Sequence, residues 1–228
     1  MKRWLRNSLV ALGVLVALAA GAWFYSTARE AVPETSTFEL DLGEARRLAR
    51  ARADHIVFTH EHGDHIDGAA RHEPPEEIAS RVRFNRAQLE NAPRLDEVAM
   101  PEVLRRTTPI DYDGLHALSP GVVLIAAPGH TPGNQLVFVV LEDGRELLFI
   151  GDVAWHMDAL RNLHYRPRLV TDWFLGEDRA AVLAQFRTLH DLLETDPKVQ
   201  VVVSHDPDQR AELLRTGALV DGFSLASP

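Results

Sequence analysis

A dense group of potential metal ligands around residue 60 constrains the fold of this chain more than any other feature. His60, His62, Asp64 and His65 come soon after the apolar run Ile56–Phe58. A short apolar run with a β-branched start predicts a buried strand, so these side chains would lie at its C-terminal end. Borderline cations such as Zn²⁺, Mn²⁺ or Fe accept neutral nitrogen together with oxygen donors. The sequence therefore predicts a metal site carried by the end of a strand.

Three later apolar runs are each followed by one more potential ligand. His130 follows Val122–Ala126, Asp152 follows Leu147–Ile150, and His205 follows Val199–Val203. A metal site needs ligands that are held on rigid elements, and strand ends provide such positions. These three side chains are therefore candidate ligands of the same site.

Together these motifs resemble those of the metallo-β-lactamase superfamily, over about residues 53–209. The resemblance rests on four elements in order: His60-x-His62-x-Asp64-His65, then Pro128–Gly133, Phe149–Asp152 and Val203–Asp206. It implies an α/β fold, an αββα sandwich that holds two divalent metal ions, most simply Zn²⁺, with Mn²⁺ or Fe as alternatives. In the set that it implies, His60, His62 and His130 hold one ion, Asp64, His65 and His205 hold the other, and Asp152 bridges both.

The resemblance also implies a hydrolase of a small-molecule substrate. A hydroxide that bridges the two ions would be the nucleophile, and Asp64 would handle the proton passed to the leaving group. The segment His205–Gln209 is similar to the His-Asp-x-x-Gln of N-acyl-homoserine lactonases, which favours a lactone or other ester. A glyoxalase II-like thioesterase is a second enzymatic alternative. His156 and Tyr165 are candidate substrate-binding residues, since a tyrosine hydroxyl near the metals could donate to a developing oxyanion.

The chain departs from the family pattern before His60. Members usually place several strands of the first sheet ahead of this loop, whereas only residues 26–59, about 34 of them, separate Tyr25 from His60. That is too few for such a set at about five or six residues a strand plus turns. We therefore expect a reduced first sheet and a short or absent substrate-covering loop. The alternative to a hydrolase is a non-catalytic or incompletely folded metal-binding pseudoenzyme of the same fold.

The amino terminus predicts a membrane segment. Three basic residues in positions 2–6 precede the uncharged run Ser8–Tyr25, which reaches the lower end of what spans a hydrocarbon core. The basic flank places the amino end in the cytoplasm. Residues 1–27 would then form a single-pass inner-membrane anchor, residues 28–36 a linker, and residues 37–228 a hydrolase domain on the periplasmic side. The alternative is a cleaved signal peptide and a secreted domain, because Ala17-Leu18-Ala19 and Ala20-Gly21-Ala22 fit cleavage patterns.

Composition narrows the possible partners and ligands. The net charge of −9 argues against a nucleic-acid partner, since no basic stripe would offset repulsion by phosphate. The chain has no cysteine, which removes disulfides and also the cysteine ligand that some β-lactamases of this fold use. Nothing in the sequence indicates an oligomeric state.

Other segments have recognisable local patterns. Glu142-Asp143-Gly144-Arg145 lies between two strand-like runs, and Asp-Gly at that place is a strong hairpin signal. Apolar residues at helical spacing predict an amphipathic helix over Asp178–Glu194. The remaining predicted elements are strands at Phe38–Leu42, Gln135–Leu141 and Glu146–Ile150, and helices at Glu44–Arg52, Ile66–Arg71 and Asp208–Arg215.

Overall fold

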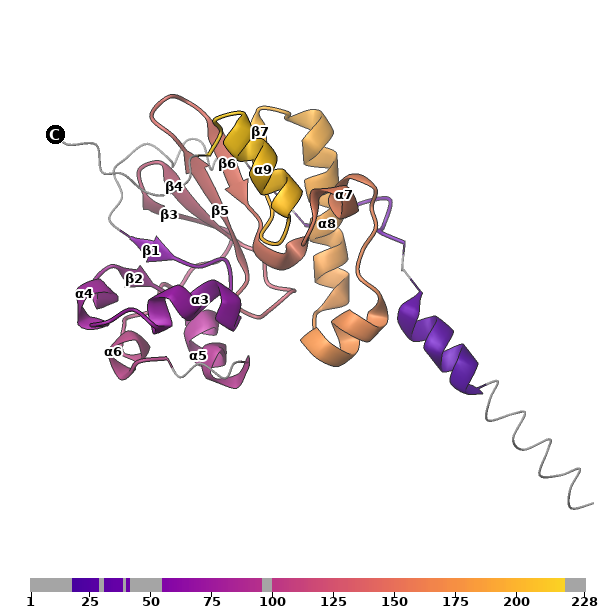
Figure 1. The fold of residues 1–228 in the computed structure, drawn as a ribbon, viewed down its shortest axis with the longest axis horizontal. Coiled ribbons are helices and arrows are strands. Elements are labelled where there is room, and N and C mark those ends of the chain that lie inside the picture. The colour runs from indigo at the N-terminus through magenta and orange to yellow at the C-terminus, as the bar shows by residue number, and fades with distance from the viewer. Residues whose placement is uncertain (1–17, 29–30, 39, 42–54, 96–99, 220–228) are drawn as a thin grey trace, which may run out of the picture.

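The computed structural model describes residues 18–28, 31–38, 40–41, 55–95 and 100–219. Its larger part is a five-stranded mixed sheet in the order β3-β4-β5-β6-β7 (Figure 1). The first four strands run antiparallel, and β7 runs parallel to β6. The strands are β3 (Leu115–Ser119), β4 (Val122–Ala126), β5 (Gln135–Val140), β6 (Glu146–Phe149) and β7 (Val199–Val202).

The predicted hairpin joins β5 to β6. The backbone N–H of Leu141 donates to Arg145 O at 2.9 Å, and that of Gly144 donates to Leu141 O at 2.9 Å. Gly144 has a φ of 85°, which is a left-handed conformation that glycine adopts without steric cost. The Asp-Gly turn signal is thus confirmed, and the turn sets the register that pairs Val140 with Glu146.

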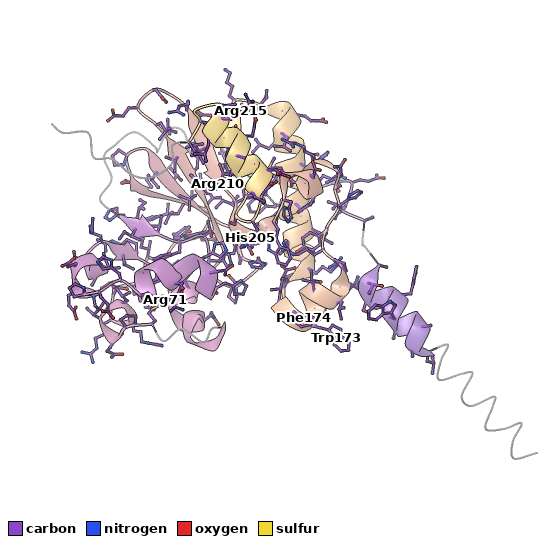
Figure 2. All side chains as sticks on the ribbon, viewed as in Figure 1. Arg71, Trp173, Phe174, His205, Arg210 and Arg215 are labelled. Carbon is purple, nitrogen blue, oxygen red and sulfur yellow. The ribbon has the colours of Figure 1, made fainter. Side chains whose placement is uncertain are left out.

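A smaller lobe lies below the sheet in Figure 1. Within the described residues, its sheet consists of two parallel strands, β1 (Ile56–Val57) and β2 (Val82–Arg83). Its helices are α3 (Gly63–Ala70), α4 (Glu76–Ala79), α5 (Arg86–Leu95) and α6 (Glu102–Arg105). The prediction of a helix at Ile66–Arg71 is confirmed by α3. In Figure 2, Arg71 marks this lobe, and Arg215 marks the far end of α9 (Pro207–Arg215).

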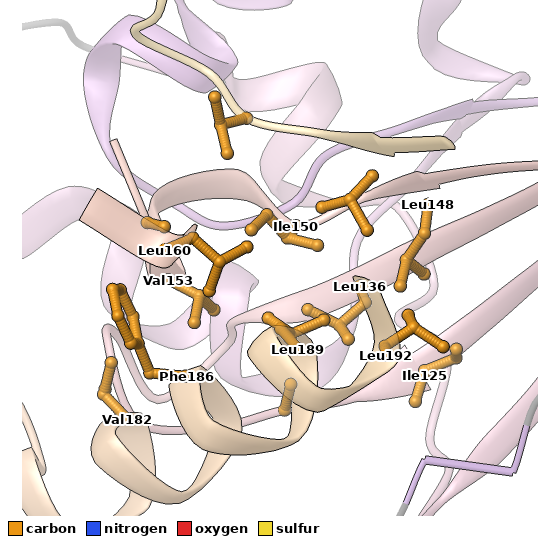
Figure 3. Packing of buried hydrophobic residues seen from close by; sticks show 14 of the residues in the cluster. Ile125, Leu136, Leu148, Ile150, Val153, Leu160, Val182, Phe186, Leu189 and Leu192 are labelled. Carbon is orange, nitrogen blue, oxygen red and sulfur yellow. The ribbon is translucent and has the colours of Figure 1, made fainter. Parts of the chain in front are cut away.

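One face of the large sheet forms the main core with α8 (Arg179–Thr195) and α7 (Met157–Arg161) (Figure 3). Alternate strand residues such as Ile125, Leu136 and Leu148 pack there, because side chains two apart in a strand share a face. From α8, Phe186 and Leu189 pack against them at helical spacing. The predicted amphipathic helix is confirmed. It begins after Asp178, whose carboxylate accepts from the backbone N–H of Ala181 at 3.1 Å.

The strand prediction for Phe38–Leu42 is wrong for its described residues, which are Phe38, Leu40 and Asp41. Phe38 and Leu40 instead pack against the main core. The Thr188 hydroxyl on α8 donates to Phe38 O at 2.8 Å, so the backbone finds its partner on a helix and not on a neighbouring strand. The predicted helix at Glu44–Arg52 lies outside the described residues.

Residues 18–27 form a helix that projects from the domain. Leu18, Trp23, Phe24 and Tyr25 are exposed on it. No helix in the described part of the chain combines the length and the hydrophobicity that crossing a membrane requires. Residues 1–17 of the predicted anchor lie outside the described residues. The anchor at 1–27, the linker at 28–36 and the domain boundary at 37 stay predictions.

Candidate metal centre

The structure brings all seven predicted ligands together, five of them in segments between elements or after strands and two at the start of a helix. His60 follows β1, His62 precedes α3 directly, and Asp64 and His65 lie in the first turn of α3. The other three come from the large sheet: His130 lies in the loop after β4, Asp152 in the 3₁₀ turn η1 (Gly151–Val153) after β6, and His205 after β7. The centre therefore lies where the two lobes meet.

Three imidazoles form one group of donors. His62 Nδ1 lies 3.0 Å from His60 Nε2 and 3.0 Å from His130 Nε2. The ligand atoms of these residues all lie within 4.8 Å of one another. This is the group that the sequence analysis assigned to the first ion.

Asp152 lies between this group and a second one. Its Oδ2 is 3.8 Å from His130 Nε2, while its Oδ1 is 3.2 Å from the Nε2 atoms of both His65 and His205. Asp64 Oδ2 completes the second group at 3.4 Å from His205 Nε2 and 3.7 Å from His65 Nε2. One carboxylate thus faces both groups with different oxygens, as a bridging ligand would.

The donor atoms fit divalent cations because of their chemistry and because two of them have no hydrogen-bond partner. His65 Nε2 and Asp152 Oδ1 are buried and have no hydrogen-bond partner, although they lie 3.2 Å apart. Buried polar atoms in native proteins are almost always satisfied, and a cation between such atoms would satisfy both. Five imidazoles and two carboxylates form a set that suits Zn²⁺. The residues present therefore fit the predicted metal ions.

Burial keeps two of the imidazoles, those of His60 and His62, in the form that binds metal. It lowers the pKa of His62 to about 4, with a further contribution from the His130 ring. The pKa of His60 is lowered further still, by burial and by the nearby His65 and His130. Burial alone would raise the pKa of Asp152, but the close His65 and His60 rings outweigh it and hold this pKa below its usual range. At neutral pH His60 and His62 are therefore neutral and Asp152 is ionised, as metal ligation requires.

Thr59 orients two of the ligands. Its Oγ1 lies 3.2 Å from the Nδ1 atoms of both His60 and His65. A contact at Nδ1 leaves Nε2 of each ring directed at the centre. Gly151, with a φ of 52°, makes room for this threonine, because a Cβ there would lie 2.7 Å from Thr59 Cβ.

Glu177 is a residue of the site that sequence reasoning missed. Its fully buried carboxylate accepts from the Nδ1–H of His130 at 2.7 Å, from the Tyr165 hydroxyl at 2.5 Å and from Arg166 Nη2 at 2.5 Å. Burial would raise the pKa of Glu177, but the His130 contact and the Arg166 charge lower it overall. The ionised carboxylate fixes the proton of His130 on Nδ1 and leaves Nε2 free for a metal.

Glu61 connects the two histidine loops. This buried carboxylate accepts from Thr131 Oγ1 at 2.7 Å and from the backbone N–H of Gly133 at 3.0 Å. Its place between His60 and His62 was the only signal that the sequence offered. Position 133 has no room for a side chain, since a Cβ there would lie 2.6 Å from the backbone nitrogen of Gln88.

A cavity of about 480 Å³ opens onto the centre. Its lining combines four candidate ligands with an apolar wall: His62, Asp64, Asp152, His205, Trp155, Phe174 and Leu175. Trp155 Nε1 also donates to Asp152 Oδ2 at 2.7 Å. Asp64, whose side chain is 59% exposed, lies at the open side, where it can reach both a bound molecule and solvent.

Neither predicted substrate-binding residue lines this cavity. Tyr165 is 1% exposed, and its hydroxyl donates to Glu177, so it supports a ligand and does not face a substrate. His156 is exposed and borders a separate depression next to Asp206. The residue adjacent to it, Trp155, lines the cavity instead.

The chain belongs to the β-lactamase superfamily. The family model described as "Beta-lactamase superfamily domain" matches residues 30–190, which confirms the resemblance drawn from the motifs. Among curated proteins, an N-acyl homoserine lactonase of a Bacillus species is 26% identical over 155 residues, which is 68% of this chain and 56% of that protein. A probable metallo-hydrolase of Mycobacterium tuberculosis is 29% identical over 174 residues, 68% of this chain and 55% of that protein.

Solved structures share the fold. An N-acyl homoserine lactone hydrolase with the product N-hexanoyl-L-homoserine bound at its catalytic metal centre superposes with a TM-score of 0.51. The two are 22% identical, and the match covers 70% of this chain and 58% of the other. The chain thus spans just over half the length of the curated relatives that it matches.

Proposed function

We propose that this protein is a metal-dependent hydrolase that holds two divalent cations, Zn²⁺ by preference, between its two lobes. The observation that carries the proposal is Asp152, whose two oxygens face two separate groups of ligands. The unpartnered buried atoms of Asp152 and His65 support it as well. His60, His62 and His130 would hold one ion. Asp64, His65 and His205 would hold the other, with Asp152 shared.

The chain's own residues have distinct tasks in such a reaction. Two bound cations supply a Lewis acid for a carbonyl and an activated water as nucleophile. Glu177 and Thr59 keep the ligand rings in one orientation, which preorganises the site. Asp64, exposed at the cavity, is placed to carry a proton to the leaving alcohol. Trp155 holds the Asp152 carboxylate and forms part of the wall against which a substrate would lie.

The proposed substrate is a lactone or other ester of modest size. A cavity of about 480 Å³ is within the range that binds small molecules. Several of the curated relatives are N-acyl homoserine lactonases, which supports a cyclic ester. Phe174 and Leu175 offer an apolar surface beside the metal ligands, suited to an acyl chain.

We also propose that the domain is on the periplasmic side of an inner-membrane anchor, which fractionation of the full-length chain would test.

Metal stoichiometry tests the two-ion site without reference to turnover. Elemental analysis of purified protein should give two ions per chain. His130→Ala should weaken chiefly the first ion and His205→Ala the second, because each removes a terminal ligand, while Asp152→Ala should disturb both. His72→Ala is the matched control, since His72 contacts Glu77 away from the centre and should leave both ions bound. A single ion that Asp152→Ala does not affect would contradict the shared carboxylate.

A substrate panel tests the hydrolase. Metal-loaded protein should hydrolyse one or more of a series of acyl lactones, aryl esters, thioesters and phosphodiesters. A chelator should abolish the activity, and Zn²⁺, Mn²⁺ or Co²⁺ should restore it. The decisive contrary result is a folded protein with two bound ions that turns over none of them. It would leave a metal-binding protein without catalysis, the alternative that the sequence analysis raised from the expected reduction of the first sheet.

A further inference from the structure

The large hydrophobic side chains that are exposed in the described residues belong to two elements. Trp173 and Phe174, 79% and 77% exposed, lie on the π-helix η2 (Leu169–Leu175). The others, Leu18, Trp23, Phe24 and Tyr25, lie on helix 18–27. Exposed aromatic residues that cluster on one part of a surface mark a binding site for protein or membrane.

The two elements are neighbours. The guanidinium carbon of Arg168, directly before η2, lies 4.9 Å from the centre of the Tyr25 ring. In Figure 2, the labelled Trp173 and Phe174 point away from the sheet, on the side where helix 18–27 leaves the domain. The aromatic residues of both elements are therefore available to the same partner.

We propose that Trp173 and Phe174 insert into the interfacial region of a lipid bilayer, and we name them the aromatic tip. Tryptophan and tyrosine concentrate at membrane interfaces, where a flat amphipathic ring lies between headgroups and acyl chains. Helix 18–27 supplies the same residue types next to the tip, and the uncharged sequence of residues 8–17 leads directly into it. A second protein chain would leave that apolar sequence without an occupant, whereas a bilayer accommodates both.

The membrane contact must rest on hydrophobic insertion, because the net charge of −9 repels anionic lipid. It also has a consequence for the cavity. Phe174 belongs both to the tip and to the cavity lining. Insertion of the tip would therefore place the mouth of the cavity at the lipid surface, where amphiphilic molecules with an acyl chain accumulate.

The absence of cysteine from the chain allows a direct measurement of depth. Single cysteines are placed in the full-length chain by Trp173→Cys, Arg71→Cys or Arg215→Cys, and each is labelled with a fluorophore. Arg71 and Arg215 are both exposed with their side chains at 69%, and they lie on other parts of the domain (Figure 2). Each labelled protein is combined with phosphatidylethanolamine and phosphatidylglycerol vesicles in which part of the lipid has brominated acyl chains. Quenching by bromine reports contact with the acyl region.

Quenching should occur at position 173 and be absent at positions 71 and 215. Phe174→Asp, introduced beside the label at 173, should abolish the quenching there, because a carboxylate resists transfer out of water. Equal quenching at all three positions, none at 173, or no effect of Phe174→Asp would overturn the proposal. So would a dimer, detected by light scattering without vesicles, that Phe174→Asp dissociates, since the tip would then be an interface between two copies. None of these readouts depends on hydrolysis.

Discussion

The substitution Glu177→Gln should perturb the metal centre, because Glu177 contacts the candidate ligand His130. The glutamate accepts three hydrogen bonds with its two oxygens, from His130, Tyr165 and Arg166. Glutamine has nearly the same shape but only one acceptor oxygen, and its amide group can only donate. In one orientation of the amide, His130 and Arg166 face another donor, and in the other Tyr165 loses its acceptor; in both, Arg166 loses its ionic partner.

The expected loss of stability depends on the contacts that Arg166 retains in Glu177→Gln. Removing one partner of a buried ion pair destabilises a protein by about 3–5 kcal/mol. Arg166, 10% exposed, retains a 2.8 Å bond to Asp152 O and its stacking over Trp155, so we expect the lower end, about 3 kcal/mol. For a chain of this length that corresponds to a fall of about 6–12 °C in Tm. Loss of the partner that orients a metal-bound histidine weakens metal binding by about 10–100-fold.

Two measurements on the same protein check these values. Thermal unfolding of the metal-free protein gives the stability, and competition with a chromophoric chelator gives the zinc affinity. Tyr165→Phe is the control, because it removes one hydrogen bond to Glu177, at a cost of about 1 kcal/mol, and leaves the His130 contact in place. The reasoning is refuted if Glu177→Gln binds zinc as the unchanged protein does, or if Tyr165→Phe weakens zinc binding equally.

Two further predictions concern stability. The metal-free protein should lose stability as the pH falls from about 6.5 towards 4, because the unfolded chain binds protons at His60 and His62 whereas the folded chain, with pKa values lowered by burial, does not. The slope should approach about 1.4 kcal/mol per pH unit for each histidine, and urea titrations at several pH values showing a flat profile would contradict it. Gly133→Ala should destabilise by about 1–3 kcal/mol, since its Cβ would lie 2.5 Å from Gln88 Cγ. Gly68→Ala in α3, with nothing within 4 Å of its Cβ, should raise Tm slightly, and equal effects of the two substitutions would refute the steric argument.

The seven positions that meet at the centre could be predicted because each is fixed by local sequence. A strand ends after an apolar run, and the residue after it is at the edge of the sheet. His205 after β7 and Asp152 after β6 illustrate this, since those strands are parallel neighbours and their ends lie together. The division of these residues into two groups, with Asp152 between them, came from the family resemblance.

The supporting residues depend on tertiary structure that local patterns do not encode. Glu177 reaches His130 because η2 ends at Gly176, whose φ of 68° turns the chain back towards the loop after β4. Nearness in sequence to Asp152 suggested Tyr165 as a substrate contact, but its hydroxyl is directed to Glu177. The strand prediction at Phe38–Leu42 failed for a similar reason. An alternating pattern indicates that one face is buried, and α8 buries it here.

The division of the candidate ligands between the lobes would link metal binding to the stability of the whole domain. His60, His62 and their neighbours belong to the lobe with its own small core around Phe58 and Phe84, whereas His130, Asp152 and His205 belong to the large sheet. Polar contacts such as Gln88 Nε2 to Gly133 O at 3.0 Å also join the lobes. A cation held by both lobes would stabilise only their native arrangement, by about 4 kcal/mol at a thousand times its Kd. The metal centre would therefore add to the polar contacts that hold the two lobes together.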